Sequence, residues 1–284
     1  MQKILVLSGK KQSGKTSACN YIHGYVLREV GVFKDFGVHP DNGDLVVPTM
    51  QRTAGGTIEE TKGFFSFGED RVLTEPYYVE FAQKQIWQYI KRYSFGDALK
   101  RNIINLYGVS VDQCYGTNDQ KDTETAITWK DITKVMGLGK TRKIMKSMGL
   151  PHSVNRSGDK EDPINRYLTA RQLMQVYGTD ICRTIDPDCW FRCTMNNVLG
   201  EKVPIAIIED ARFPNEIDGV DSLANAYDID VKTIRCERDL FGDTHHSETA
   251  LDDYENFDLR IPHECELDEK HELILAALRE WGWV

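Results

Sequence analysis

GKKQSGKT, residues 9–16 of the chain, follows the apolar run KILVLS at residues 3–8 and precedes a helical pattern over residues 16–28. A short, continuous apolar run is typical of a central parallel strand that is buried on both faces. The octapeptide matches G-x-x-x-x-G-K-[ST], and it stands between a strand and a helix, where this motif has a mechanism. A chance match in a chain of this length is on the order of one in a hundred. The sequence therefore predicts a phosphate-binding loop.

The residues at the fixed positions of the motif suit the binding of a phosphate group. Gly9 and Gly14 allow successive backbone N–H groups to approach a phosphate, and the start of the following helix adds a partial positive charge. Lys15 is expected to reach the β- and γ-phosphates of a nucleoside triphosphate as a point charge. Thr16 is expected to bind Mg²⁺ through its hydroxyl group.

The variable positions of the loop have less specific roles. Lys11 and Ser13 are expected to contribute mainly their backbone groups to ATP binding. Lys10 is less constrained by the loop, so its side chain can point toward the phosphate of an acceptor. We therefore include Lys10 among the candidate catalytic and acceptor-binding residues.

A second polar cluster, EDARFPNE at residues 209–216, follows the apolar run PIAII at residues 204–208. Acids at the carboxyl end of such a strand lie at the edge of an open α/β sheet where ligands bind. Glu209 or Asp210 can support the magnesium ion, or Asp210 can instead bind the acceptor. Arg212 offers a planar fork to a phosphate. A surface Asp-Arg pair beside a helix cap explains the same residues without a site.

The order of the elements predicts the fold class. Apolar strands recur at residues 204–208 and 231–234, with helical segments between them. This alternation favours a parallel sheet covered by helices through right-handed crossovers. We therefore expect an α/β protein with the three-layer P-loop NTPase fold, formed by a single domain over residues 1–284. Segments at about 37–75 and 116–167 do not fit the repeat and are expected to be inserted flaps.

The two predicted insertions differ in character. The first has strand-like pieces at residues 45–47 and 63–67, which predict a hairpin. The second contains a basic run at residues 140–146 and a polar loop at 155–162. The basic run can meet nucleic acid, but a solvated helix face explains it more simply.

Composition limits the function classes. The formal net charge is −9 over 284 residues, so no global positive field is available to hold nucleic acid. No apolar run approaches the roughly 20 residues of a membrane span. The apolar stretch at the N-terminus is too short for a signal peptide, and the seven cysteines lack CxxC spacing. We expect a cytoplasmic enzyme with reduced thiols, and the sequence leaves a homodimer open.

The chain resembles the bacteriophage deoxynucleoside monophosphate kinases, which are P-loop nucleotide kinases. The resemblance runs along most of the chain outside the two predicted insertions. It rests on GKKQSGKT at residues 9–16 and on four further regions, one of them in two parts: YSFGDALK at 93–100, ARQLMQVYGTD at 170–180 with DPDCW at 186–190, DARFPNE at 210–216, and HSETAL at 246–251.

The resemblance implies which residues surround the acceptor nucleotide. Two arginines of this set can neutralise the acceptor phosphate, a tryptophan can stack on the base or wall it off, and acids can bind the base or sugar. The implied acceptor-binding residues are Lys10, Arg171, Gly178, Trp190, Asp210, Arg212 and Glu216.

The resemblance also bears on the donor. Arg235 and Arg238 come after the strand predicted at residues 231–234. The resemblance implies a role for arginines at this place in binding the donor phosphates. Residues 261–263 read IPH where relatives tend to have Ile-x-Asn. This departure leaves any adenine contact at that position undefined.

Together these features suggest transfer of the γ-phosphoryl group from Mg-ATP to a deoxynucleoside monophosphate, giving ADP and a deoxynucleoside diphosphate. The catalytic candidates are Lys15, Lys10 and Arg212, and Mg²⁺ is the implied cofactor. The acceptor oxygen is already anionic, so no strong general base is needed. The alternatives are a P-loop kinase of another small phosphorylated acceptor and a nucleic-acid-stimulated ATPase. No stable nucleic-acid partner and no membrane association are expected.

Replacement of Lys15 by alanine is expected to abolish turnover, because the loop then lacks the charge that binds the β- and γ-phosphates. The measurement is ADP release from Mg-ATP in the presence of deoxynucleoside monophosphates. Unchanged turnover in the Lys15→Ala variant would contradict the role of the whole loop.

Overall fold

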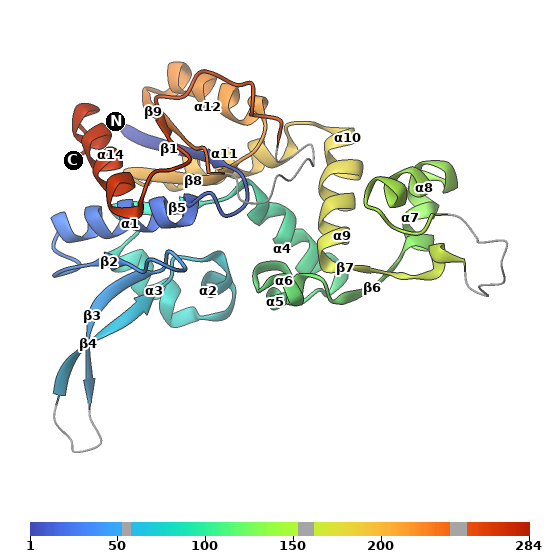
Figure 1. Ribbon diagram of the computed structural model, residues 1–284, viewed down its shortest axis with the longest axis horizontal. Coiled ribbons are helices and arrows are strands. Elements are labelled where there is room, and N and C mark those ends of the chain that lie inside the picture. Colours follow the sequence, from blue (N-terminus) through green and yellow to red (C-terminus); the bar gives the residue numbers. More distant parts are fainter. Residues whose placement is uncertain (53–57, 153–161, 239–248) are drawn as a thin grey trace. The chain divides into compact units, whose positions relative to one another are not determined.

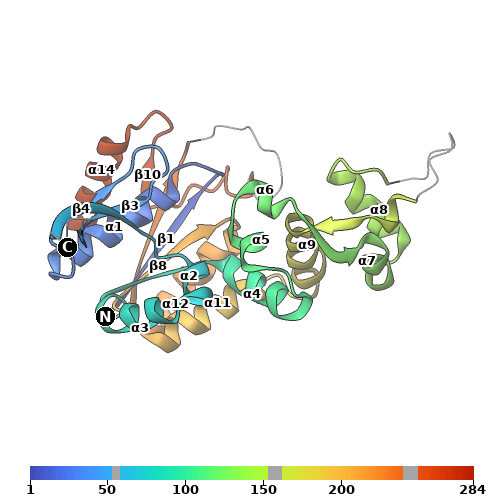
Figure 2. The same ribbon diagram turned by 90° about the horizontal axis from the view of Figure 1, so that it is seen from below.

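The computed structural model describes residues 1–52, 58–152, 162–238 and 249–284. These residues form two compact units, whose elements are drawn in Figures 1 and 2. The core unit comprises residues 1–96 and 191–284, and the inserted unit comprises residues 97–190. Each unit is described by itself.

A five-stranded parallel sheet organises the core unit. Its spatial order is β10-β9-β1-β8-β5, and every neighbouring pair is parallel. The chain leaves β1, adds β5 and β8 on one side, and then adds β9 and β10 on the other. The strand order therefore reverses at β1, and ligands of open α/β sheets bind at such a switch point. The strands are β1 (Gln2–Gly9), β5 (Ile90–Tyr93), β8 (Ile205–Ala211), β9 (Ile229–Cys236) and β10 (Leu259–Ile261).

Helices cover both faces of this sheet (Figure 1). One face packs against α1 (Lys15–Glu29) and α14 (Leu267–Glu280), and the other packs against α11 (Cys189–Glu201) and α12 (Pro214–Tyr227). This arrangement confirms the predicted three-layer α/β fold.

The burial of successive residues explains why β1 is apolar throughout. Side chains alternate between the two faces of a strand. Leu5 and Leu7 belong to the core beneath α1 and α14, whereas Ile4 and Val6 belong to the core beneath α11 and α12. All four are at most 1% exposed, as expected for a strand covered on both sides.

A small antiparallel sheet lies within the first predicted insertion, and it includes the predicted hairpin. It consists of β2 (Gly37–Val38), β3 (Leu45–Arg52) and β4 (Ile58–Phe65). Leu45 and Val47 are buried in the same core as α1. Helices α2 (Glu69–Thr74) and α3 (Pro76–Gln85) then lead to β5.

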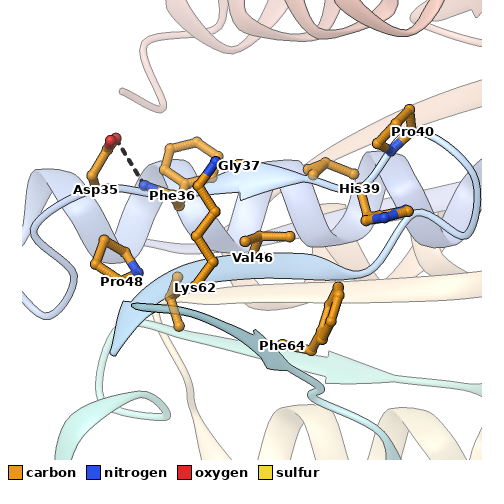
Figure 3. A pocket seen from close by; sticks show the side chains of 11 residues that line it. Asp35, Phe36, Gly37, His39, Pro40, Val46, Pro48, Lys62 and Phe64 are labelled. Atoms are coloured by element: carbon orange, nitrogen blue, oxygen red, sulfur yellow. Dashed lines mark hydrogen bonds between the residues drawn. The ribbon is translucent and has the colours of Figure 1, made fainter. Parts of the chain in front are cut away.

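The outer side of the small sheet carries a groove of about 340 Å³ (Figure 3). Its lining includes Phe36, Val46, Pro48, Lys62 and Phe64. Phe64 is 66% exposed, and Lys62 extends across the groove in Figure 3. The groove is therefore an open surface feature rather than an enclosed cavity.

The loop between β2 and β3 is fixed to the beginning of α1. Asn20 Nδ2 donates a hydrogen bond of 2.8 Å to the carbonyl oxygen of Gly43. A Cβ atom on Gly43 would lie 3.1 Å from Ser17 Cβ, and its φ of +74° is in the left-handed region. The first predicted insertion thus contacts the helix that follows the phosphate-binding loop.

The inserted unit has a core of its own, which includes Trp129 and Leu168. The basic run predicted at residues 140–146 lies on α8, where Thr141, Ile144 and Met145 are buried and the lysines are exposed. The basic side chains therefore lie on the solvent face of α8, and the nucleic-acid reading of this run is not tested. The elements from the boundary onward are α4 (Phe95–Tyr107), α5 (Val111–Tyr115), α6 (Asn118–Lys121), β6 (Glu124–Thr128), α7 (Trp129–Met136), α8 (Leu138–Ser147), the 3-10 turn Pro163–Asn165, β7 (Tyr167–Thr169), α9 (Ala170–Gln175), the π-helix Val176–Cys182 and α10 (Arg183–Ile185).

The second predicted insertion, at residues 116–167, falls within the inserted unit, and most of its polar loop at 155–162 lies outside the described residues. The organisation of the chain as one catalytic domain with two flaps stays a prediction. In the described part of the chain, no helix has the length and apolar character needed to cross a membrane.

Replacement of Ile207 by alanine is expected to lower the free energy of unfolding by about 2–5 kcal/mol, because it leaves a cavity in the central sheet. Ile207 lies on β8 and is fully buried. Urea denaturation of the two proteins measures the difference. Met50→Ala is the control, since Met50 is 69% exposed and its loss should change the stability by less than about 0.5 kcal/mol. Equal effects of the two substitutions would contradict the assignment of this core.

Candidate active site

The phosphate-binding loop is built so that only glycine fits at two positions. Gly9 ends β1 with a φ of +151°, and a Cβ atom there would lie 2.6 Å from the carbonyl oxygen of Cys236. Gly14 precedes α1 with a φ of +89°. Both angles lie in the region that L-residues with a side chain rarely adopt. The backbone of the loop is therefore set by the two glycines of the motif.

Lys15 lies inside the curve of this loop. Its Nζ donates hydrogen bonds of 2.6 Å to the carbonyl oxygens of Gly9 and Lys10. Burial, with repulsion from Arg212 as the second cause, lowers the pKa of Lys15 from 10.5 to about 8. Glu209 and Asp210 act on Lys15 in the opposite direction. The loop and the cluster after β8 therefore share one electrostatic environment.

Asp210 makes a set of hydrogen bonds that the motif alone did not reveal. Its Oδ2 accepts from Ser94 Oγ at 2.6 Å and from the Gly96 N–H at 3.0 Å, and its Oδ1 accepts from the Phe95 N–H at 2.7 Å. The carboxylate thus joins the end of β8 to the start of α4. These hydrogen bonds give a structural role to the stretch at residues 93–100, one of those on which the family resemblance rests.

Glu209 differs from Asp210 in its hydrogen bonding. Its Oε2 atom is buried and makes no hydrogen bond to any group in the described ranges. Arg92 Nη1 lies 3.4 Å from this oxygen. A buried carboxylate oxygen that has an ion pair but no hydrogen bond can still bind a hard cation or a water molecule of its shell.

Glu216 organises the backbone around Arg212. Its Oε2 accepts hydrogen bonds from the Arg212 N–H at 2.7 Å and from the Phe213 N–H at 3.1 Å, and Glu216 is only 1% exposed. A glutamate at this position of the first turn satisfies N–H groups that the helix itself cannot pair. Glu216 therefore fixes the direction in which the chain presents Arg212.

A carboxylate that sequence reasoning did not select joins two of the predicted basic residues. Asp252 Oδ2 lies 3.1 Å from Lys10 Nζ, and Asp252 Oδ1 accepts from Arg235 Nη2 at 2.8 Å. Arg235 also donates to Ser8 Oγ at 2.9 Å. Arg238 is exposed at the end of a described segment. Asp252 follows the similar stretch at residues 246–251, of which His246, Ser247 and Glu248 lie outside the described residues.

The other predicted acceptor residues belong to the inserted unit. Arg171 donates to Asp122 Oδ1 at 2.7 Å and to Asn118 Oδ1 at 3.0 Å. Trp190 is 7% exposed, and its Nε1 donates to the carbonyl oxygen of Gly178 at 3.1 Å. Gly178 lies in the π-helix Val176–Cys182, a distortion that often marks functional sites. The structure thus brings Gly178 and Trp190 together.

The central strand of the parallel sheet ends in this glycine-bounded loop, and Lys15, Arg212 and two acids lie at its edge. This arrangement is consistent with the fold of P-loop nucleotide kinases. A family model described as deoxynucleotide monophosphate kinase matches residues 123–273, more than half of the chain. The chain belongs to the deoxynucleotide monophosphate kinase family. It is accordingly an ATP-dependent phosphotransferase that acts on deoxynucleoside monophosphates. No curated protein matches the chain.

The binding of ATP is expected to take up a proton above about pH 8. The amine of Lys15 has a pKa of about 8 in the protein, and the anionic phosphates favour its charged form. The affinity for ATP should therefore fall by up to about tenfold per pH unit between pH 8 and 10. Calorimetric titrations at pH 9, in two buffers of different ionisation enthalpy, measure the proton uptake.

The control for this measurement is Lys15→Arg, because a guanidinium stays protonated throughout this pH range. That variant should bind ATP without net proton uptake at pH 9. A wild-type protein that takes up no proton at this pH would show that Lys15 is already fully charged before ATP binds.

Proposed function

We propose that the protein transfers the γ-phosphoryl group of Mg-ATP to the phosphate of a deoxynucleoside monophosphate, giving ADP and a deoxynucleoside diphosphate. The observation that supports this proposal best is the electrostatic coupling of Lys15 and Arg212 at the carboxyl edge of the sheet. Two positive charges at such close range are favourable only when phosphates lie between or beside them.

The chemistry needs positioning and charge rather than a general base. The attacking oxygen of the acceptor phosphate is anionic, and the transferred group spreads negative charge over its own oxygens. Lys15 stabilises the charge on the donor phosphates, and Arg212, oriented through Glu216, neutralises the acceptor phosphate. Lys10 leaves Asp252 to contact the acceptor phosphate in the same step.

The residues present fit a magnesium ion. Mg²⁺ bound to ATP needs phosphate oxygens, waters and one or two protein oxygens, so no cluster of three acidic or histidine ligands is required, and none is found among the described residues. We infer that Thr16 and Glu209 hold the ion, because Thr16 is exposed and Glu209 Oε2 has no hydrogen-bond partner in the described ranges. Asp210 is the less suitable carboxylate because both of its oxygens already accept hydrogen bonds. When bound, the ion neutralises charge that develops on the phosphates.

The assignments for the acceptor nucleotide and for Arg235 and Arg238 rest on the resemblance. The acceptor nucleotide contacts Arg171, Gly178 and Trp190, with Asp210 and Glu216 acting through the backbone that they hold. Arg235 and Arg238 act on the donor phosphates together with the backbone of Gly9, Lys11, Ser13 and Gly14. We further propose a bacteriophage enzyme that works in the cytoplasm, without nucleic acid or membrane partners, and that can form a homodimer.

A panel of acceptors tests the function. Purified protein is incubated with Mg-ATP and with each deoxynucleotide, each ribonucleotide and other small phosphorylated metabolites, and ADP release is followed. At least one deoxynucleoside monophosphate should raise ADP release well above the rate without acceptor, and chelation of Mg²⁺ should remove that activity. Lys15→Ala, purified in the same way, is the control for contaminating kinases.

Two results would contradict the proposal. Turnover with another phosphorylated acceptor but with no deoxynucleotide would identify a different small-molecule kinase. ATP hydrolysis that DNA stimulates, without any small acceptor, would identify a nucleic-acid-stimulated ATPase.

A further inference from the structure

Lys270 occupies a position that the pattern of its helix assigns to an apolar residue. On α14 the buried residues are Lys270, Ile274, Ala277 and Leu278. This spacing is that of one helix face, which packs toward the core beneath the sheet. Lys270 is only 6% exposed. The helix thus directs one charged side chain into an otherwise apolar interface.

The ammonium group of Lys270 lies against the phosphate-binding loop. A Cβ atom built on Gly14 would lie 2.1 Å from Lys270 Nζ. The charges of Lys270 and Lys15 also both oppose the rise in the pKa of Cys236 that burial causes. These contacts place Lys270 at the residue that precedes α1, on the same side of the sheet as Lys15.

No group within the described ranges forms a hydrogen bond or an ion pair with this ammonium. The acids nearest to it in sequence, Glu266, Asp268 and Glu269, are exposed in the first turn of α14. The Nζ atom is not among the fully buried polar atoms that lack a partner, so this ammonium reaches the surface beside the loop, where an anionic ligand can pair with it. The backbone around Gly14 is the part of this motif that holds the α- and β-phosphates.

We propose that Lys270 is a second phosphate-binding lysine of the donor site, pairing with the α- or β-phosphate of ATP beside Gly14. This inference rests on the proposed function, because it assumes that the loop holds the donor nucleotide. It assigns to α14 a part in binding phosphate that no motif in its sequence indicates.

Replacement of Lys270 by methionine tests the inference, since methionine has a similar length without the charge. The affinities of ATP and ADP, measured by calorimetry, should both fall by about 10- to 100-fold, the effect of losing one charged hydrogen bond. The KM for ATP should rise in parallel, whereas the KM for the deoxynucleoside monophosphate should stay within about twofold. Lys270→Arg should restore most of the affinity.

A second measurement separates binding from structure. The midpoint of thermal unfolding, measured without added nucleotide, should not fall in Lys270→Met, because the ammonium makes no hydrogen bond or ion pair within the described ranges. A lysine that merely supported the fold would give a lower midpoint. The matched control is Arg279→Met, which removes one positive charge from an exposed position of the same helix and should change neither affinity nor midpoint.

The outcomes are distinct. Unchanged affinity for ATP and ADP in Lys270→Met, or in Lys270→Gln if the first variant does not fold, would overturn the inference. A lower midpoint with unchanged affinity would assign Lys270 a structural role and would equally overturn it. If the wild-type protein binds ATP but phosphorylates no deoxynucleotide, the proposed function fails while the binding comparison still tests Lys270.

Discussion

The parallel register between β1 and β8 is the constraint on which the rest of the core unit depends. Val6 pairs with Ile208, and Ser8 pairs with Ala211 after an irregularity in the ladder. The two strands therefore end together, and the loop after Gly9 lies beside the acids and the arginine that follow β8. A slip of one residue would turn every buried side chain of β1 to the opposite face. Because both faces are apolar, the shapes of the two cores, rather than an alternation of apolar and polar residues, fix this register and with it the geometry of the site.

Positive charge is concentrated in a protein that is acidic overall. The formal net charge is −9, yet Lys15, Arg212 and Lys270 act around one loop. Burial lowers the pKa of Lys15, and its hydrogen bonds to carbonyl oxygens compensate this penalty only in part. A polyphosphate relieves this repulsion locally. Local electrostatics thus favour a highly charged substrate.

The apolar strands and the glycine motif made much of the core predictable from sequence. Strand β5 was not recognised, because Lys91 and Arg92 interrupt its apolar pattern at the edge of the sheet. Asp210 accepts hydrogen bonds from groups more than 100 residues away in the chain. Asp252 pairs with Arg235, which is 17 residues away. Such pairings leave no local signal in the chain. Lys270 carries no sequence signal of this kind, because helical periodicity identifies only the apolar members of a core-facing side.

The carboxylate shared by Lys10 and Arg235 has an evolutionary consequence. Arg235 is 7% exposed, so removal of Asp252 would leave its guanidinium buried without its ion-pair partner. Removing one member of such a pair is far more damaging than replacing both. Positions 235 and 252 are therefore expected to change together among homologous enzymes, while Lys10, which is more accessible, can vary independently of Arg235.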